Sequence, residues 1–91
     1  MPYPRPIAYV ASRISTTENE LRDFATRGWI STKEENGNVF VSGRHEYKAR
    51  FILHLRHRLG LTNEEIARVL DVQEAPYSLK DVPAILGRKL M

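Results

Sequence analysis

The segment TTENELRDFATRGWI, Thr16 to Ile30, contains side chains that can hydrogen-bond the edges of DNA bases. Arginine can donate two hydrogen bonds to guanine, and asparagine can pair with adenine in the same bidentate manner. Arg22 and Asn19 are therefore candidate base contacts. For Arg22 a second interpretation stays open, an exposed ion pair with Glu18 four residues earlier.

One residue of this segment counts against binding to DNA. Asp23 follows Arg22 directly, and a carboxylate that faces phosphates is repelled by them. Arg27 lies four residues further on, at the spacing of a helical ion pair. If the two side chains pair, the objection becomes weaker.

The positive charge of the chain is concentrated in one segment. The net charge is +3, and the charges before Arg44 and after Arg58 cancel or are slightly acidic. The segment itself contains Arg44, Lys48, Arg50, Arg56 and Arg58 against Glu46 alone. A localised basic segment favours a polyanionic partner, and Arg44 and Lys48, with Lys33 earlier in the chain, are candidate phosphate contacts. The alternative is a solvated charged helix face.

Other kinds of chemistry find little support. His54 and His57 lie three residues apart without a carboxylate at helical spacing, which makes surface positions a better interpretation than a metal site. No serine, histidine and aspartate arrangement, glycine-rich phosphate loop or carboxylate pair indicates an active site. We expect no enzyme activity, no metal and no cofactor.

Length and composition indicate one small globular domain. A chain of 91 residues with 42% hydrophobic and 27% charged residues can form one core but no deep cleft. It contains no cysteine and no apolar run long enough to span a membrane, so we expect a cytoplasmic protein. The predicted domain covers residues 1–91, with a core of residues 7–70 and a C-terminal extension of residues 71–91.

Two short helices with a tight turn between them place the candidate base contacts. Ile7, Val10, Ala11 and Ile14 predict a first helix, and Ser15 and Thr16 predict the turn. Thr17 and Glu20 have the spacing of a capping box, which predicts a second helix from Thr17 to Arg27, ended by Gly28. This is the helix-turn-helix arrangement, whose second helix enters the major groove.

The next segment predicts a β-hairpin and further helices. Asn36-Gly37 is a strong signal for a two-residue turn between strands at Trp29–Lys33 and Val39–Val41, a wing in this context. Trp29 is expected in the core. A longer helix is predicted from Arg44 to Leu59, with Tyr47, Phe51, Leu55 and Leu59 directed inward, followed by a capped helix that starts at Thr62 and a short terminal helix from Asp81.

From Ile7 to Leu70 the sequence resembles the DNA-binding domain of MerR-type transcription regulators. The residues that carry the resemblance are Ile7, Val10-Ala11, Leu21-Arg22, Phe24, Gly28-Trp29-Ile30, Glu35-Asn36-Gly37, Phe51-Ile52, Leu55-Arg56, Gly60 and Glu65-Ile66. The resemblance implies a mainly α fold, a small winged helix-turn-helix domain with a two-stranded β-hairpin wing, that reads double-stranded DNA. It also implies that Thr16, Thr17, Asn19 and Arg22 lie near the duplex.

The sequence departs from the MerR pattern at several positions. Asp23 stands where the family commonly has an aromatic residue, and Asn38-Val39 replaces the usual Tyr-Arg of the wing. The stretch LRHRLGL has one residue more than the usual spacing, and the long C-terminal dimerisation helix is missing. LRHRL and TENEL also resemble the chaperone modulators of the CbpM type, which bind a J-domain co-chaperone.

We therefore predict binding to double-stranded DNA by a small MerR-like regulator or accessory factor. The alternative is a protein-protein interaction module of the CbpM type. The predicted DNA-binding residues are Thr16, Thr17, Asn19, Arg22, Lys33, Asn36, Asn38, Arg44 and Lys48. A homodimer or a protein partner could use the C-terminal segment SLKDVPAILGRKL.

Overall fold

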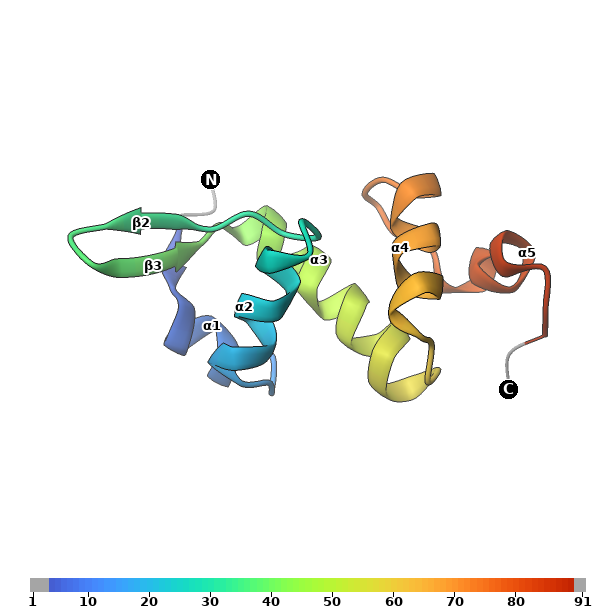
Figure 1. The fold of residues 1–91 in the computed structure, drawn as a ribbon, viewed down its shortest axis with the longest axis horizontal. Coiled ribbons are helices and arrows are strands. Elements are labelled where there is room, and N and C mark those ends of the chain that lie inside the picture. Colours follow the sequence, from blue (N-terminus) through green and yellow to red (C-terminus); the bar gives the residue numbers. More distant parts are fainter. Residues whose placement is uncertain (1–3, 90–91) are drawn as a thin grey trace. The chain divides into compact units, whose positions relative to one another are not determined.

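A computed structural model describes residues 4–89, and its elements follow the predicted order with one additional strand (Figure 1). The strands are β1 (Arg5–Pro6), β2 (Lys33–Glu35) and β3 (Asn38–Val41). The helices are α1 (Ile7–Arg13), α2 (Glu18–Thr26), α3 (Gly43–Leu53), the π-helical turn η1 (His54–Arg58), α4 (Asn63–Val72), the 3-10 turn η2 (Leu79–Asp81) and α5 (Val82–Leu86). The mainly α winged helix-turn-helix fold is confirmed.

The chain divides into two compact units, with the boundary inside α3 after Arg50. The first unit contains the helix-turn-helix and the sheet, and the second contains η1, α4 and α5. A single domain over residues 1–91 stays a prediction, and residues 1–3 and 90–91 lie outside the part of the chain that the structure describes.

The first unit begins with the predicted helix-turn-helix. Val10 and Ala11 of α1 and Leu21 and Phe24 of α2 are buried, so the two helices contribute to one core. Ser15 adopts a left-handed conformation with φ of 60° and turns the chain between the helices. The polar outer face of α2 stays in solvent because the apolar residues of both helices lie inward.

At the ends of α2 the structure confirms the cap at Thr17 and the glycine after the helix, and the Glu20 carboxylate accepts from the Thr16 hydroxyl at 2.6 Å. The hydroxyl oxygen of Thr17 accepts a hydrogen bond of 3.1 Å from the backbone N–H of Glu20, which caps the helix. After the helix, Gly28 has φ of 79°, a left-handed conformation that glycine adopts without strain. Trp29 then packs with its ring 5.8 Å from that of Phe24, and its burial confirms the predicted core position.

The predicted strand at Trp29–Lys33 is wrong for most of its length. Trp29 and Ile30 are both buried, whereas successive residues of a strand point to opposite faces. These two residues fill the core directly after the helix, and β2 starts only at Lys33. The apolar character of the segment therefore reflects core packing rather than pairing.

The hairpin itself is confirmed, and a third strand joins it. β2 and β3 are antiparallel, with Glu35 opposite Asn38, and Asn36 and Gly37 have φ of 51° and 80°, as a tight primed turn requires. β1 pairs with the other edge of β3, with Arg5 opposite Val41. The sheet order β1-β3-β2 ties the start of the chain to the wing.

The long helix differs from the prediction in two respects. Tyr47, expected to point inward, is 47% exposed, because residues four apart drift by about 40° per step around a helix of 3.6 residues per turn. Phe51 and Leu55 are buried as predicted. The helix also changes type, since α3 ends at Leu53 and the π-helical turn η1 follows.

The hydrogen-bonded turn of η1 contains one residue more than a turn of α-helix. The backbone N–H of Leu59 donates to the carbonyl of His54, five residues earlier, at 3.1 Å. The turn overlaps LRHRLGL, the stretch in which the sequence predicts one residue more than the MerR pattern.

In the second unit, α4 is capped as predicted and α5 packs on it. Thr62 and Glu65 form both hydrogen bonds of a capping box, at 3.0 and 3.1 Å. The same Glu65 carboxylate accepts from Nε and Nη2 of Arg88 at 2.7 and 3.0 Å. Val82 and Leu86 of α5 are buried, so the extension after residue 71 belongs to a folded unit.

Candidate nucleic-acid interface

The outward face of α2 exposes the two candidate base contacts. Asn19 is exposed, and the side chain of Arg22 is 53% exposed. Arg22 Nη2 lies 3.9 Å from Oε1 of Glu18, at the outer limit of an ion pair, and both groups are well hydrated. Such a pair contributes at most a few tenths of a kcal/mol, about 0.3–0.5. Arg22 can therefore exchange Glu18 for another partner at little cost.

Asp23 is paired within the helix, which weakens the main objection to DNA binding. Nε of Arg27 donates to both carboxylate oxygens of Asp23, at 3.1 and 3.0 Å. The guanidinium of Arg27 also lies 5.5 Å from the centre of the Trp29 ring. The Asp23 charge is thus opposed by a cation that the core residue Trp29 helps to hold in place.

The two threonines before α2 have structural partners. The hydroxyl of Thr16 donates to Oε1 of Glu20 at 2.6 Å, and Thr16 is half-buried. Thr17 accepts at its hydroxyl oxygen from the N–H of Glu20 and is exposed. Since a hydroxyl can accept and donate together, Thr17 keeps its own proton for an external acceptor.

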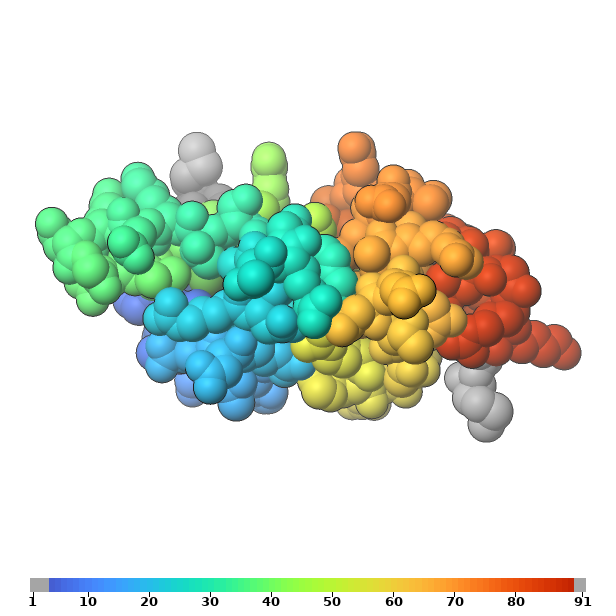
Figure 2. Space-filling view, in the orientation of Figure 1, coloured from blue at the N-terminus to red at the C-terminus, as the bar shows by residue number. Residues whose placement is uncertain are grey.

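Every predicted DNA-binding residue of the wing is exposed. Lys33 lies 3.3 Å from the carboxylate of Glu35 on the same strand, while Asn36 and Asn38 flank Gly37 at the tip. In the space-filling view the green atoms of the hairpin stand beside the blue-to-cyan atoms of α2 on one open face (Figure 2). Arg22 and Asn38 line one groove between these elements.

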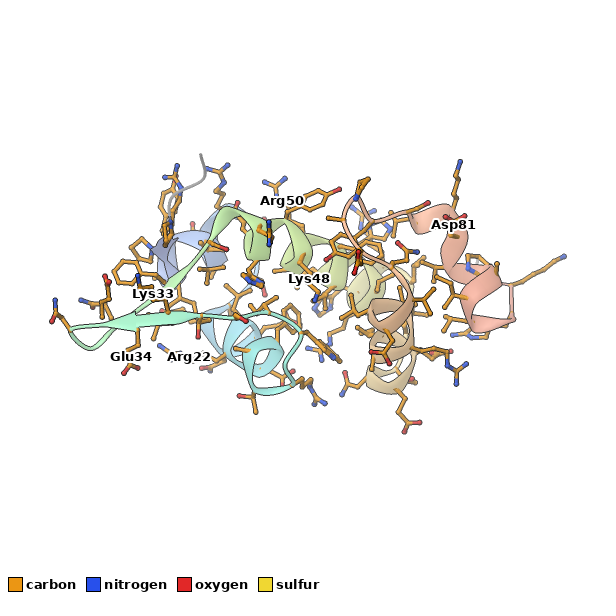
Figure 3. All side chains as sticks on the ribbon, turned by 90° about the horizontal axis from the view of Figure 1, so that it is seen from above. Arg22, Lys33, Glu34, Lys48, Arg50 and Asp81 are labelled. Carbon is orange, nitrogen blue, oxygen red and sulfur yellow. The ribbon has the colours of Figure 1, made fainter. Side chains whose placement is uncertain are left out.

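The predicted cations do not gather on one side of the hairpin. Glu34 and Arg22 line a common groove, whereas Lys33 lies on the other side of β2 beside Phe40 and His45 (Figure 3). The alternation of side chains along a strand is the cause. Arg22 therefore has carboxylates as neighbours on both sides, Glu18 on the helix and Glu34 on the wing.

The start of α3 carries Arg44 and Lys48 on one side of the helix, since they are four residues apart. Between them in sequence is His45, whose Nδ1 accepts a 3.3 Å hydrogen bond from the backbone N–H of Ser31. Burial, followed by the charges of Lys48 and Arg44, lowers the pKa of His45 below its usual 6.5. Sequence reasoning missed this link, because no local pattern connects residues 14 positions apart.

A buried carboxylate fixes α3 to α1. Glu46 is 7% exposed, and its Oε2 lies 2.8 Å from Nε of Arg13. Sequence reasoning assigned Glu46 no partner, although its isolation among basic residues was a hint of a specific role. The pair holds the start of α3, and with it Arg44 and Lys48, in a defined orientation relative to the helix-turn-helix.

Metal binding and membrane insertion receive no support from residues 4–89. No three histidine, aspartate or glutamate side chains within this range are placed to share a metal ion. None of the helices in this range has the length and apolar character needed to cross a bilayer.

A comparison with family models decides the family. The model for MerR HTH family regulatory proteins matches residues 6–73, which include the helix-turn-helix, the wing, α3 and α4. The chain belongs to this family. Comparisons with curated proteins and with solved structures give no match.

At the level of the family, this MerR-type chain is a DNA-binding regulator. The match includes the helix-turn-helix and the wing, in which Asn19, Arg22 and Asn38 are exposed. Nothing in the comparisons favours the CbpM resemblance over the MerR resemblance.

Proposed function

We propose that this protein binds double-stranded DNA as a small transcriptional regulator or accessory factor, with α2 in the major groove. The observation that carries the proposal is the state of the α2 surface. Asn19 and Arg22 are exposed and at most weakly engaged, while Asp23, the residue that opposes DNA binding, is held by Arg27. The second helix of a helix-turn-helix normally reads base edges.

Within this complex each residue of α2 has a distinct role. Arg22 would donate to N7 and O6 of a guanine, and Asn19 would pair with N6 and N7 of an adenine. Thr17 would donate its hydroxyl proton to a phosphate oxygen while it caps the helix, and Thr16 would fix the turn through Glu20.

The backbone contacts would come from the wing and from α3. Asn36 and Asn38 at the hairpin tip would contact one strand, and Arg44 and Lys48 would contact phosphates near the start of α3. Lys33 is left out of this set because it lies on the side of β2 away from Arg22. These contacts supply affinity and register without sequence choice. We expect a moderate salt dependence, because few of these residues are cations.

The proposal is tested by fluorescence anisotropy with a labelled random duplex at several salt concentrations. Micromolar binding that weakens with salt supports a DNA-facing surface, and selection of a preferred duplex follows. On that duplex Arg22→Ala should lose about 10-fold or more in affinity, whereas Arg68→Ala, an equal charge change at an exposed position of α4, should lose little.

Absence of binding at low salt would overturn the proposal. The carboxylates of Glu18 and Glu34 beside Arg22 interrupt the positive surface, which is the feature that a protein partner would exploit. In that case the next experiment is a pull-down with a J-domain protein, the partner class implied by the CbpM resemblance.

A further inference from the structure

Arg22 lies between two grooves that separate α2 from the hairpin. One has a volume of about 360 Å³ and is lined by Arg22, Thr26 and Glu34 among others. The other has a volume of about 390 Å³ and includes Arg22, Glu18 and Asn38. Each groove therefore combines the same guanidinium with a carboxylate, and donors and acceptors alternate across this face of the first unit.

Glu18 and Arg22 are adjacent on α2 without being committed to each other. They are one helical turn apart, their charged atoms are 3.9 Å apart, and their side chains are 48% and 53% exposed. Glu18 occupies the first turn of α2, directly after the cap residue Thr17. In a helix-turn-helix complex the N-terminal residues of the recognition helix are those that contact base edges.

A carboxylate at this position restricts what the face can bind. Phosphate oxygens only accept hydrogen bonds, so they are repelled by Glu18 and gain nothing from it. In the major groove, however, cytosine presents its N4 amino group as a donor, and guanine presents N7 and O6 as acceptors. A carboxylate beside a guanidinium is complementary to a cytosine and a guanine in adjoining base pairs.

We propose that Glu18 is a specificity-determining residue that accepts from a cytosine amino group next to the guanine read by Arg22. This inference rests on the DNA-binding function proposed above. Glu18 and Arg22, whose charged atoms are 3.9 Å apart in the free protein, would separate on binding. Each side chain would then contact one of two neighbouring bases. Glu34, in the other groove, disfavours phosphate beside Arg22 and so strengthens the requirement for a base edge.

The test compares duplexes selected from a random pool by the wild-type protein, Glu18→Gln and Glu64→Gln. Glu64 is an exposed residue in the first turn of α4, so its variant has the same change in charge at a similar helical position in the other unit. The wild-type protein and Glu64→Gln should both select a cytosine adjacent to a guanine. Glu18→Gln should lose the cytosine preference while it keeps the guanine, because an amide both donates and accepts.

Affinities on the selected duplex make the test quantitative. Replacing the cytosine pair by a thymine pair should weaken the wild-type protein and Glu64→Gln by about 10-fold, and Glu18→Gln by less than about 3-fold. Binding of Glu18→Gln to random duplex should be tighter than that of the wild-type protein. If Glu18→Gln selects the same cytosine, the assignment of Glu18 is overturned although DNA binding stands. If the wild-type protein binds no duplex at low salt, both proposals are overturned.

Discussion

Asp23 and Arg27 show how the outward face of α2 accommodates an acidic residue. The carboxylate receives two contacts of about 3 Å from one guanidinium nitrogen, and that guanidinium lies over the ring of Trp29. Both side chains are a little more than one-third exposed, so solvent weakens the pair. The pair therefore adds little to the stability of the helix. The positive charge of Arg27 still offsets the negative charge of Asp23 on the surface of α2.

We therefore predict that Asp23→Asn tightens DNA binding about 2- to 3-fold at low salt, because one phosphate-repelling charge is removed. The free energy of unfolding should decrease by only about 0.3–0.5 kcal/mol, the usual value for a helical ion pair. Anisotropy and urea denaturation measure the two quantities. Weaker DNA binding by Asp23→Asn would show that the carboxylate positions Arg27 for a direct contact instead.

His45 introduces a pH dependence into the attachment of the wing. Its Nδ1 can accept from the Ser31 N–H only while that nitrogen is unprotonated. Because the pKa of His45 is lower in the folded than in the unfolded protein, its contribution to stability is complete above about pH 6.5. The contribution is lost as the pH falls through the pKa of the folded state.

Accordingly, we expect the free energy of unfolding to fall between pH 7 and pH 5 by up to about 1 kcal/mol through this hydrogen bond. His45→Gln keeps an acceptor but cannot titrate, so its unfolding free energy should change less over this range. Thermal unfolding at several pH values provides the measurement, with His57→Gln as the control. Identical pH profiles for the wild-type protein and His45→Gln would contradict the prediction.

Among the elements, those defined by local signals were predicted from the sequence. The cap at Thr17, the glycine after α2 and the turn at Asn36-Gly37 each act over a few residues, and the structure confirms all three. The capping box at Thr62 is complete as well. Candidate contacts on α2 could be named because helical spacing alone determines which residues share its outer face.

Features that depend on contacts between distant segments were not predictable. Trp29 and Ile30 follow α2 into the core instead of forming a strand, because tertiary burial overrides their β propensity. The pairing of β1 with β3 and the link from His45 to Ser31 connect residues remote in sequence. Lys33 lies on the opposite side of β2 from Arg22. Predicting this side would have needed the correct first residue of the strand.

The start of α4 and the end of α5 are joined through Glu65, and this contact can be tested by titration. Hydrogen bonds from Arg88 and from the Thr62 backbone lower the pKa of Glu65 from 4.5 to about 2. The contribution of Glu65 to stability is therefore complete above about pH 4.5 and is lost as the pH falls through 2. Arg88→Ala should raise this pKa towards 4.5, as measured by NMR of the carboxyl carbon. Lys89→Ala, a neighbouring charge removal, should leave it near 2.

The helix cap of α4 offers a second test at the same scale. Thr62→Ala removes the hydroxyl that accepts from the Glu65 N–H and should reduce the free energy of unfolding by about 1 kcal/mol. Ser12→Ala, at an exposed position inside α1, should have a much smaller effect. Chemical denaturation measures both. If Thr62→Ala and Ser12→Ala reduced the free energy of unfolding equally, the cap would make no specific contribution to stability.

For the whole molecule, the described part of the second unit, residues 51–89, exposes few large apolar side chains. Val82 and Leu86 are buried, and the exposed large apolar residues of the second unit are Val72 and Leu79 within residues 51–89, at 64% and 39%. A stable interface covers about 800 Å² on each partner, far more than two side chains provide. Within residues 51–89, these two exposed side chains do not supply an interface of that size.

We predict that the protein sediments as a monomer and binds one selected half-site in a 1:1 complex. Sedimentation velocity of the protein alone and with a fluorescent duplex checks both statements. A dimer that dissociates in Val72→Glu would contradict the monomer and support the homodimer predicted from the sequence, and two-fold symmetric duplexes would then be the preferred sites.

The π-helical turn at His54–Arg58 has a consequence for the history of this chain. A helix can absorb a single inserted residue as one wide turn, so that the capped helix after it keeps its ends and its packing. We therefore expect the extra residue predicted for LRHRLGL to lie within the helix rather than in the loop at Gly60. Relatives that lack the insertion should align with this chain through a gap at residues 54–58, and deletion of one residue there should regenerate an unbroken α-helix without loss of the fold.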